Sequence, residues 1–266
     1  MGLLVARIIA IANQKGGVGK TTTCVNLAAS LAAMQKRVLL VDLDPQGNAS
    51  MGCGVDKYSL TFSVYDVLVN ATPISSALKP AAEGGFDVLP SNGDVTAAEV
   101  ELIAKDGRER RLRSALGQVQ ANYDFILIDC PPSLNLLTLN GLVASDGVII
   151  AMQCEYFALE GLSALLDTIE QVRSSVNVGL EVEGILRTMY DPRNSLTNAV
   201  SGQLHEHFGD KVYRTVIPRN VRLAEAPSHG VPAMHYDKLS RGSRAYMALA
   251  GEIIRRYERS TSGTGG

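Results

Sequence analysis

Two lysines lie five residues apart in the glycine-rich segment Asn13–Thr23, which reads NQKGGVGKTTT. The glycines around them let backbone N–H groups converge on phosphate oxygens without a side-chain clash. Lys20 can then reach the β- and γ-phosphates of a nucleotide, and the hydroxyl of Thr21 can ligate Mg²⁺. The formal pattern G-x-x-x-x-G-K-[ST] fails at one position, because Gln14 stands where its first glycine would be. The segment therefore predicts a phosphate-binding loop with one extra lysine, Lys15.

Three aspartates follow apolar runs and could serve a metal ion or a water molecule. Asp42 and Asp44 close the run VLLVDLD, and Asp129 ends the run FILID. Acids at strand ends beside a phosphate-binding loop are placed to hold Mg²⁺ through water or to act on an attacking water. Asp129 fits the role of holding the metal through water. Asp42 could support the water shell of the metal, or it could equally be a turn former or a helix cap.

The four cysteines form no CxxC pair, which suits neither a zinc site nor a disulfide framework and favours reduced thiols in a cytoplasm. Cys130 and Cys154 each lie in or beside an apolar run. We therefore expect them to be small buried residues rather than ligands of a cluster shared between subunits. The apolar run GLLVARIIAIAN near the start is too short to span a bilayer and is interrupted by Arg7. Together these features favour a cytoplasmic protein.

Short apolar runs alternate with helical segments along the chain. The expected strands are Arg7–Ala12, Val38–Asp42, Phe86–Leu89, Phe125–Asp129, Gly147–Met152, Val182–Met189 and Val212–Ile217. The expected helices are Lys20–Met34, Ala97–Gln120, Leu134–Ala144, Leu159–Val176, Ser195–Phe208 and Ser243–Arg259. This alternation predicts an α/β fold, a doubly wound and mainly parallel sheet with helices on both faces. The carboxyl ends of such strands meet at one edge, where ligands bind.

The domain organisation expected from this pattern is simple. The segment Met51–Gly85 is less regular and rich in Gly, Ser, Thr and Pro, so we interpret it as an excursion from the sheet. Residues 1–259 are expected to form a single domain. Residues 260–266 are small and polar, and we expect a disordered tail there.

Several segments resemble those of one protein family. KGGVGKTT resembles the deviant Walker A motif of the ParA/MinD superfamily of ATPases. The segments RVLLVDLDPQGNAS, YDFILIDCPPSL, QCEYFALEGLSALL and IPRNVRLAEAPSHGVP narrow the resemblance to the ParA/Soj group of chromosome- and plasmid-partitioning ATPases. The resemblance extends from about Ile8 to Tyr257. It implies a P-loop NTPase fold, ATP and Mg²⁺ as ligands, and ATP hydrolysis as the activity.

The resemblance also implies roles for individual residues. Lys15 would reach across an ATP-bound homodimer to the nucleotide of the partner subunit, as an arginine finger does. Asp44 would orient the attacking water, so that the catalytic set is Lys15, Lys20 and Asp44. Pro218 would pack on the adenine ring with Asn220 nearby. The expected nucleotide contacts are Lys15, Gly16, Gly17, Val18, Gly19, Lys20, Thr21, Thr22, Pro218 and Asn220.

A basic C-terminal third points to a polyanion as partner. Residues 187–266 hold 12 Lys and Arg against 7 Asp and Glu, whereas the rest of the chain holds 13 against 20. In the family that the chain resembles, the positions of Arg193 and Arg222 carry basic residues that meet DNA, and Arg219 could extend this face. No base-reading module is evident, so binding would be to the phosphates of double-stranded DNA, independent of sequence and weakened by salt. The resemblance further implies a ParB-type partner that stimulates hydrolysis, and a location on the nucleoid.

Three alternatives remain open at this level. MinD-type relatives bind membranes through a C-terminal amphipathic helix, but the apolar stripe of Ser243–Arg259 is better explained as a helix that closes the fold. An orphan relative could position another cargo with the same ATPase cycle. A metabolic or redox enzyme on the same fold would need a substrate pocket or a metal cluster.

Overall fold

The computed structural model describes residues 6–156 and 158–262. The strands in this part are β1 (Arg7–Ala12), β2 (Val38–Asp42), β3 (Lys79–Pro80), β4 (Asp87–Leu89), β5 (Phe125–Asp129), β6 (Gly147–Gln153) and β7 (Glu181–Thr188). The α-helices are α1 (Lys20–Ala33), α2 (Asn48–Gly52), α3 (Val64–Val69), α4 (Ile74–Ala77), α5 (Val95–Glu101), α6 (Arg111–Leu116), α7 (Leu136–Ala144), α8 (Ala158–Ser175), α9 (Ser195–Phe208), α10 (Val221–Glu225), α11 (Ala233–Tyr236) and α12 (Arg241–Ser262). The 3₁₀ helices are η1 (Leu102–Ala104), η2 (Arg108–Arg110), η3 (Gln120–Asn122), η4 (Gly209–Lys211) and η5 (Ala226–His229).

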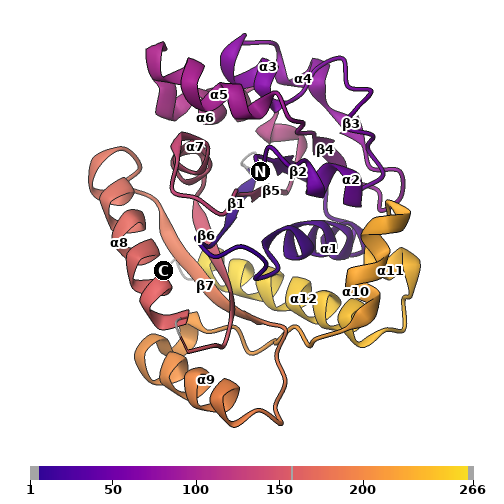
Figure 1. Cartoon of the computed structure of the whole chain (residues 1–266), viewed down its shortest axis with the longest axis vertical. Helices are drawn as coiled ribbons and strands as arrows, with labels where there is room; N and C mark the ends of the chain where they lie inside the picture. Colours follow the sequence, from indigo (N-terminus) through magenta and orange to yellow (C-terminus); the bar gives the residue numbers. More distant parts are fainter. Residues whose placement is uncertain (1–5, 157, 263–266) are drawn as a thin grey trace.

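The strands form one sheet in the order β3-β4-β2-β5-β1-β6-β7 (Figure 1). Neighbouring strands are parallel except for the β3–β4 pair. The register places Asp129 opposite both Ile11 and Asp42, so the ends of β1, β2 and β5 meet at one edge. The expected doubly wound, mainly parallel α/β sheet is therefore confirmed.

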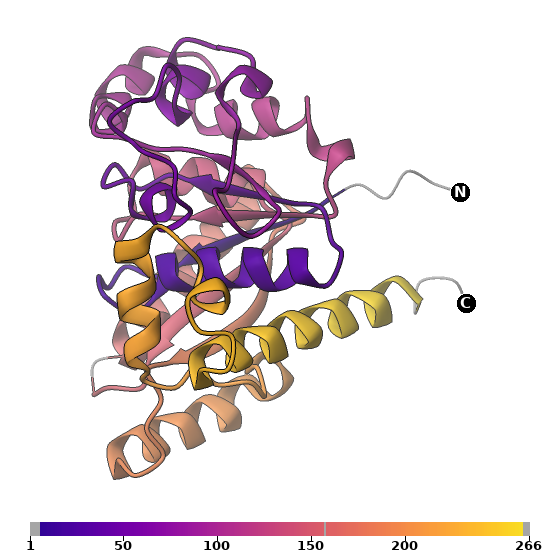
Figure 2. The ribbon, with the colours of Figure 1, turned by 90° about the vertical axis from the view of Figure 1, so that its right-hand side faces the viewer.

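Helices cover both faces of the sheet because the side chains of β1 alternate between two cores. Ile9 and Ile11 pack with residues of α1 and α12. Ile8 and Ala10 pack with residues of α7 and α8 on the opposite face. Figure 2 shows α1 and α12 side by side on their face of the sheet. Burial on both faces explains why the strands read as continuous apolar runs.

The predicted strand Val212–Ile217 is wrong. This segment lies beside β7 but forms only isolated bridges, such as the one that pairs Ile185 with Val212. The N–H groups of Arg214 and Thr215 donate to the buried carboxylate of Glu252 on α12, at 2.9 and 3.0 Å. A side chain from another element thus takes backbone groups that a strand ladder would have used.

The predicted helix Ala97–Gln120 is also wrong. The structure divides it into α5, η1, η2 and α6, and the break falls at Gly107, whose φ of 60° is left-handed. An α-helix cannot continue through that conformation, which glycine adopts readily. The carbonyl of Arg108, next to the break, accepts a hydrogen bond from Asn140 of α7 at 2.8 Å. Tertiary contacts therefore override a helical pattern that is continuous in sequence.

The other predicted elements are confirmed, and most of their ends lie within two residues of the predicted ends. The excursion Met51–Gly85 contains α3, α4 and β3, none of which the sequence pattern predicted. The last helix runs to Ser262 and so takes in residues 260–262 of the expected polar tail. Residues 263–266 lie outside the described part of the chain.

Gly184 in β7 gives a test of how tightly the sheet and Tyr213 pack. A Cβ atom at Gly184 would lie 2.5 Å from Cε2 of the fully buried Tyr213 and 2.9 Å from the carbonyl oxygen of Lys211. Gly184→Ala should therefore lower the free energy of unfolding by about 1–3 kcal/mol, measured by urea titration. Gly202→Ala is the control, because Gly202 is an exposed residue of α9 and no atom lies within 4 Å of the position that its Cβ would take. Equal stability of the two variants would contradict the packing argument.

Candidate functional site

The loop between β1 and α1 has the geometry of an anion site. Gly17 and Gly19 have φ values of 73° and 89°, a backbone conformation that residues with a side chain rarely adopt. Apart from chain neighbours, no atom of the described residues lies within 4 Å of a Cβ position built on Gly16 or Gly17, so their backbone is open to approach. In the same part of the chain no side chain caps the N-terminus of α1, so the first N–H groups of this helix remain available to a ligand. Free N–H donors and the helix dipole together favour a phosphate at this position.

Lys20 lies under the loop with its ammonium group directed at backbone oxygen. The residue is only 6% exposed, and its Nζ donates to the carbonyl of Lys15 at 3.2 Å. Burial lowers the pKa of Lys20, while the nearby Asp129 and Asp44 act in the opposite direction. A buried cation with a single backbone partner is suited to charge-assisted bonds with phosphate oxygens.

Asp129 and Asp42 form a buried carboxylate pair at the ends of β5 and β2. Both are fully buried, and burial is the main cause that raises the pKa of each. The charge of Asp42 raises the pKa of Asp129 further, and the charge of Asp44 acts in the same direction on both. Ser50 holds Asp42 through its N–H and its hydroxyl, both at 2.8 Å from Oδ2. The side chain of Thr21 lies close enough to Asp129 to lower the pKa of that carboxyl, against the effect of burial. The structure thus brings together the three residues expected to serve the metal.

The oxygen atoms of this pair fit Mg²⁺. Oδ2 of Asp129 is buried and has no hydrogen-bond partner among the described residues. A hydroxyl and carboxylates are the hard oxygen donors that Mg²⁺ prefers. Mg²⁺ is usually held by one or two carboxylates together with water and substrate phosphates, and this pair supplies the carboxylates.

Asp44 lies just beyond β2 on a rigid turn. Its N–H donates to Oδ1 of Asp42 at 3.1 Å, and its own Oδ1 accepts the N–H of Gln46 at 2.9 Å. Its side chain is half-buried, unlike that of Asp42. Asp42 is occupied by Ser50 and by the turn, whereas Asp44 keeps an oxygen accessible near Lys20. This arrangement favours Asp44 over Asp42 as the carboxylate that orients a water molecule.

Lys15 does not share the environment of Lys20. Its Nζ forms an ion pair with Glu155, which follows β6, and its side chain remains 55% exposed. Its N–H donates to Oδ1 of Asn13 at 2.9 Å, so the backbone at Lys15 is anchored while the side chain lies at the surface. Sequence reasoning missed Glu155, although it lies in the segment QCEYFALEGLSALL. The pairing depends on the β1–β6 contact and no local pattern could have revealed it.

A cavity of about 180 Å³ lies beside the phosphate loop. Pro218 and Asn220 line it together with Thr22 of α1, so the predicted base contacts do lie beside the predicted phosphate contacts. Oδ1 of Asn220 is buried and has no partner among the described residues. The hydroxyl of Thr188, which was not predicted, lines the same cavity and donates to the carbonyl of Val18 at 2.7 Å, tying β7 to the loop. A mainly apolar cavity that holds a buried amide oxygen is suited to a flat aromatic ring such as a nucleobase.

The three arginines predicted to meet DNA lie near the loops after β7. Arg193 is 89% exposed and forms a two-point ion pair with Asp191, at 2.9 and 2.7 Å. Arg219 is exposed, and it acts with Arg193 to lower the pKa of Asp191 to about 2. Arg222, on α10, is half-exposed and forms ion pairs with two carboxylates. The predicted cations are thus at the surface, but two of them already have partners.

The cysteines behave as core residues. Cys130 and Cys154 are 1% and 3% exposed, and burial raises the pKa of the Cys154 thiol to about 11. Burial also raises the pKa of the Cys130 thiol far above its ordinary value. The expectation that they are buried small residues is confirmed. In the described part of the chain, no helix combines the length and the apolar character needed to cross a bilayer.

Comparisons with known proteins agree with this geometry. A family model described as an AAA domain matches residues 6–182. The sporulation initiation inhibitor protein Soj of Bacillus subtilis is 54% identical over 247 residues, which cover 93% of this chain and 98% of that protein. The chromosome partitioning protein ParA of Caulobacter vibrioides is 52% identical over 252 residues, which cover 94% of each. The structure of cobyrinic acid a,c-diamide synthase from Mycobacterium smegmatis, with bound ADP and magnesium, is 38% identical with a TM-score of 0.84, and covers 95% of this chain and 96% of that chain.

These matches include the parts of the molecule that carry the site. The family model spans β1, β2 and β5, and with them the phosphate loop and the three aspartates. Two of the relatives share more than half of the aligned residues with this chain over nearly its full length. The chain belongs to the AAA-domain family and, within the P-loop proteins, to the ParA/Soj family of chromosome-partitioning ATPases.

Proposed function

We propose that this chain is a Mg²⁺-dependent DNA-partitioning ATPase that binds nonspecific DNA as an ATP-bound dimer and leaves it after hydrolysis. The observation that carries the proposal is the convergence of Lys20, Thr21, Asp129 and Asp44 at the ends of β1, β2 and β5. These groups supply a phosphate cation, a metal ligand, a water-mediated metal contact and a carboxylate for the attacking water.

In the proposed reaction the phosphate loop and α1 bind the β- and γ-phosphates through N–H groups and Lys20. Mg²⁺, when bound, would be held by Thr21 and through water by Asp129, with Asp42 supporting its water shell, and would neutralise phosphate charge. Asp44 orients a water molecule for attack on the γ-phosphate. Pro218 and Asn220 contact adenine in the cavity beside Thr22.

Lys15 is proposed to act in the partner subunit rather than in its own. Its exposed side chain lies on Glu155 instead of pointing to the phosphates that Lys20 serves. A second cation supplied across a dimer stabilises charge that develops during phosphoryl transfer. ATP binding and homodimer formation would therefore be coupled through Lys15.

The DNA face is proposed to include Arg193, Arg219 and Arg222. Contacts of these guanidinium groups with phosphates would be independent of sequence. The family relationship supports a ParB-type partner that stimulates hydrolysis, and a cytoplasmic, nucleoid-associated location. An orphan relative that positions another cargo would use the same cycle, and the neighbouring genes would separate the two.

The 38% identical synthase structure raises a biosynthetic enzyme as an alternative. The relatives named Soj and ParA favour partitioning, because they are more similar to this chain, at 54% and 52% identity. A biosynthetic enzyme of this kind would hydrolyse ATP in response to its substrate and would not retain DNA.

Retention on a short duplex of random sequence tests the proposal. We expect wild-type protein to bind with ATP and Mg²⁺, and not with ADP or without nucleotide. The logarithm of the binding constant should fall linearly with the logarithm of salt concentration, with a slope of about −0.9 per phosphate contact. Arg222→Ala should weaken binding. It removes one phosphate contact from each subunit, so the salt dependence of binding by the dimer should become shallower by about two. Arg173→Ala on α8 is the control. If wild-type protein is not retained on the duplex with any nucleotide, the proposal is refuted.

A further inference from the structure

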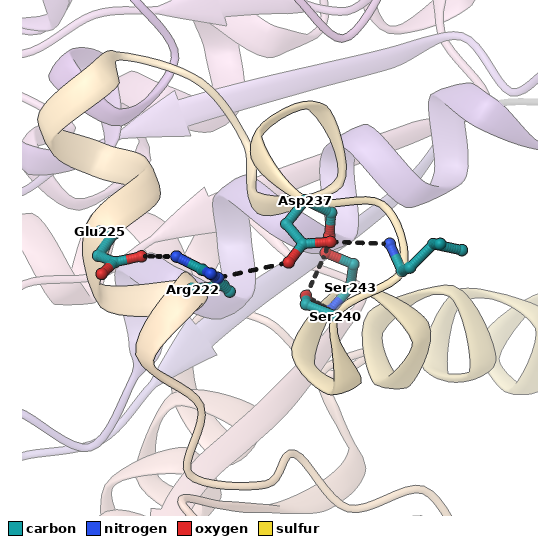
Figure 3. A network of polar contacts seen from close by, with 6 residues as sticks. Arg222, Glu225, Asp237, Ser240 and Ser243 are labelled. Carbon is teal, nitrogen blue, oxygen red and sulfur yellow. Dashed lines mark hydrogen bonds and ion pairs between the residues drawn. The ribbon is translucent and has the colours of Figure 1, made fainter.

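Arg222 is the predicted DNA contact with the most contacts to its own chain. Its Nη1 donates to Oε2 of Glu225 at 2.7 Å, and its Nε lies 3.4 Å from Oδ2 of Asp237 (Figure 3). Its guanidinium carbon also lies 5.9 Å from the ring centre of Tyr236. One cation thus faces two carboxylates, so the cluster carries a net negative charge. A DNA phosphate that approaches this cluster is repelled until at least one carboxylate withdraws.

Asp237 is held firmly in place. Its Oδ1 accepts the N–H of Leu239 at 3.1 Å, and its carbonyl accepts the hydroxyl of Ser243 at 2.8 Å. The hydroxyl of Ser240 donates to that of Ser243 at 2.9 Å, and Figure 3 shows these groups gathered at the start of α12. The contact between Arg222 and Asp237 therefore joins α10 to a fixed point in the turn between α11 and α12.

The helix that carries Arg222 is also a wall of the base cavity. Leu223 and Ala224 of α10 line that cavity, and so does Asn220, which immediately precedes the helix. Leu223 packs closely on α12, because a Cβ atom built on Gly242 would lie 2.6 Å from its Cγ. The short helix α10 is thus held between the base cavity and α12, with Arg222 bridging to Asp237.

We propose that Glu225 and Asp237 restrain Arg222 in a state that cannot bind DNA, and that a base in the cavity releases it by shifting α10. This inference rests on the proposed function of ATP-dependent DNA binding. The unpartnered Oδ1 of Asn220 gives the base a direct contact at the start of α10. Both carboxylates are about two-fifths exposed, so these ion pairs are weak enough for phosphates to replace. The arrangement makes the DNA face respond to the nucleotide within one subunit, in addition to any effect of dimer formation.

Charge-neutral variants of the two carboxylates test this restraint. Asp237→Asn keeps an oxygen to accept the N–H of Leu239, and Glu225→Gln leaves that turn untouched, so each should fold. We expect the double variant to bind a random duplex about five- to tenfold more tightly than wild type without nucleotide. With ADP or with ATP the two proteins should differ by less than about twofold, because both nucleotides carry the base that releases the restraint. Glu170→Gln is the matched control, since Glu170 pairs with Arg173 at the same i,i+3 spacing on α8.

Three results would overturn the inference, and they separate it from the proposed function. Unchanged binding of the double variant without any nucleotide, with normal ATP-dependent binding of wild type, would show that the carboxylates do not restrain Arg222. Weaker binding of the variant with ATP would assign Glu225 and Asp237 to positioning Arg222 on DNA instead. Failure of wild type to bind DNA with ATP would refute the proposed function itself, and the inference with it.

Discussion

Asp44→Ala should bind ATP normally and lose at least about 99% of the hydrolysis rate, because positioned acid–base groups contribute about 10²–10⁴-fold. The carboxylate of Asp44 is oriented by the N–H of Gln46 and by the bond from its own N–H to Asp42. Removing it leaves Lys20, Thr21 and Asp129 intact, so the dissociation constant for ATP should change by less than about threefold. The variant should therefore accumulate in its ATP-bound form and remain on DNA longer than wild type.

Single-turnover phosphate release and an ATP titration measure the two effects separately. Asp56→Ala is the matched control, because Asp56 accepts the N–H of Tyr58 at 3.0 Å in the same type of turn, away from the strand ends. If Asp44→Ala hydrolyses ATP at the wild-type rate, then a group other than Asp44 orients the attacking water. A loss of ATP binding equal to the loss of rate would assign Asp44 to holding the metal instead.

The parts of the site that follow a strand directly could be predicted from the sequence. Asp42 and Asp129 end apolar runs that become central strands, and Lys20 closes the loop that follows a third such run. Parallel pairing then brings these strand ends together. The residue types that bind phosphate and Mg²⁺ are few, so their order along the chain is informative. This is why the sheet and the phosphate loop were predicted with bounds close to those of the structure.

Contacts between distant segments could not be predicted in the same way. The pair Lys15–Glu155 joins residues 140 positions apart, and neither side chain has a local partner that would reveal it. The segment Val212–Ile217 has a strand-like composition, but Glu252 takes its N–H groups. The charge count predicted a basic face, yet Asp191 and Asp237 already pair with its arginines. Charge composition reports which groups exist, whereas their pairing depends on the assembled fold.

Lys15→Gln should abolish ATP-dependent dimer formation and DNA retention while ATP binding by the monomer persists. The physical reason is that Lys20 is buried under the phosphate loop, where it is proposed to serve the phosphates of its own subunit, whereas Lys15 is exposed and paired with Glu155. A cation supplied in trans contributes about 10³–10⁵-fold to phosphoryl transfer, so hydrolysis should fall by at least about 1,000-fold. Glutamine keeps most of the length of the side chain and removes only its charge.

The decisive measurements for Lys15→Gln are the mass in solution with ATP and Mg²⁺ and the monomer's affinity for ATP. Lys105→Gln is the control, because Lys105 is an exposed lysine directly after η1, in a segment that is not part of the phosphate loop or the strand ends. If Lys15 acts within its own subunit, the variant will instead lose ATP affinity in the monomer. If it still dimerises and binds DNA as wild type does, the lysine has no role in trans. Only loss of the dimer with intact ATP affinity fits a lysine that is held by Glu155 in the monomer and reaches the partner's nucleotide when two subunits close.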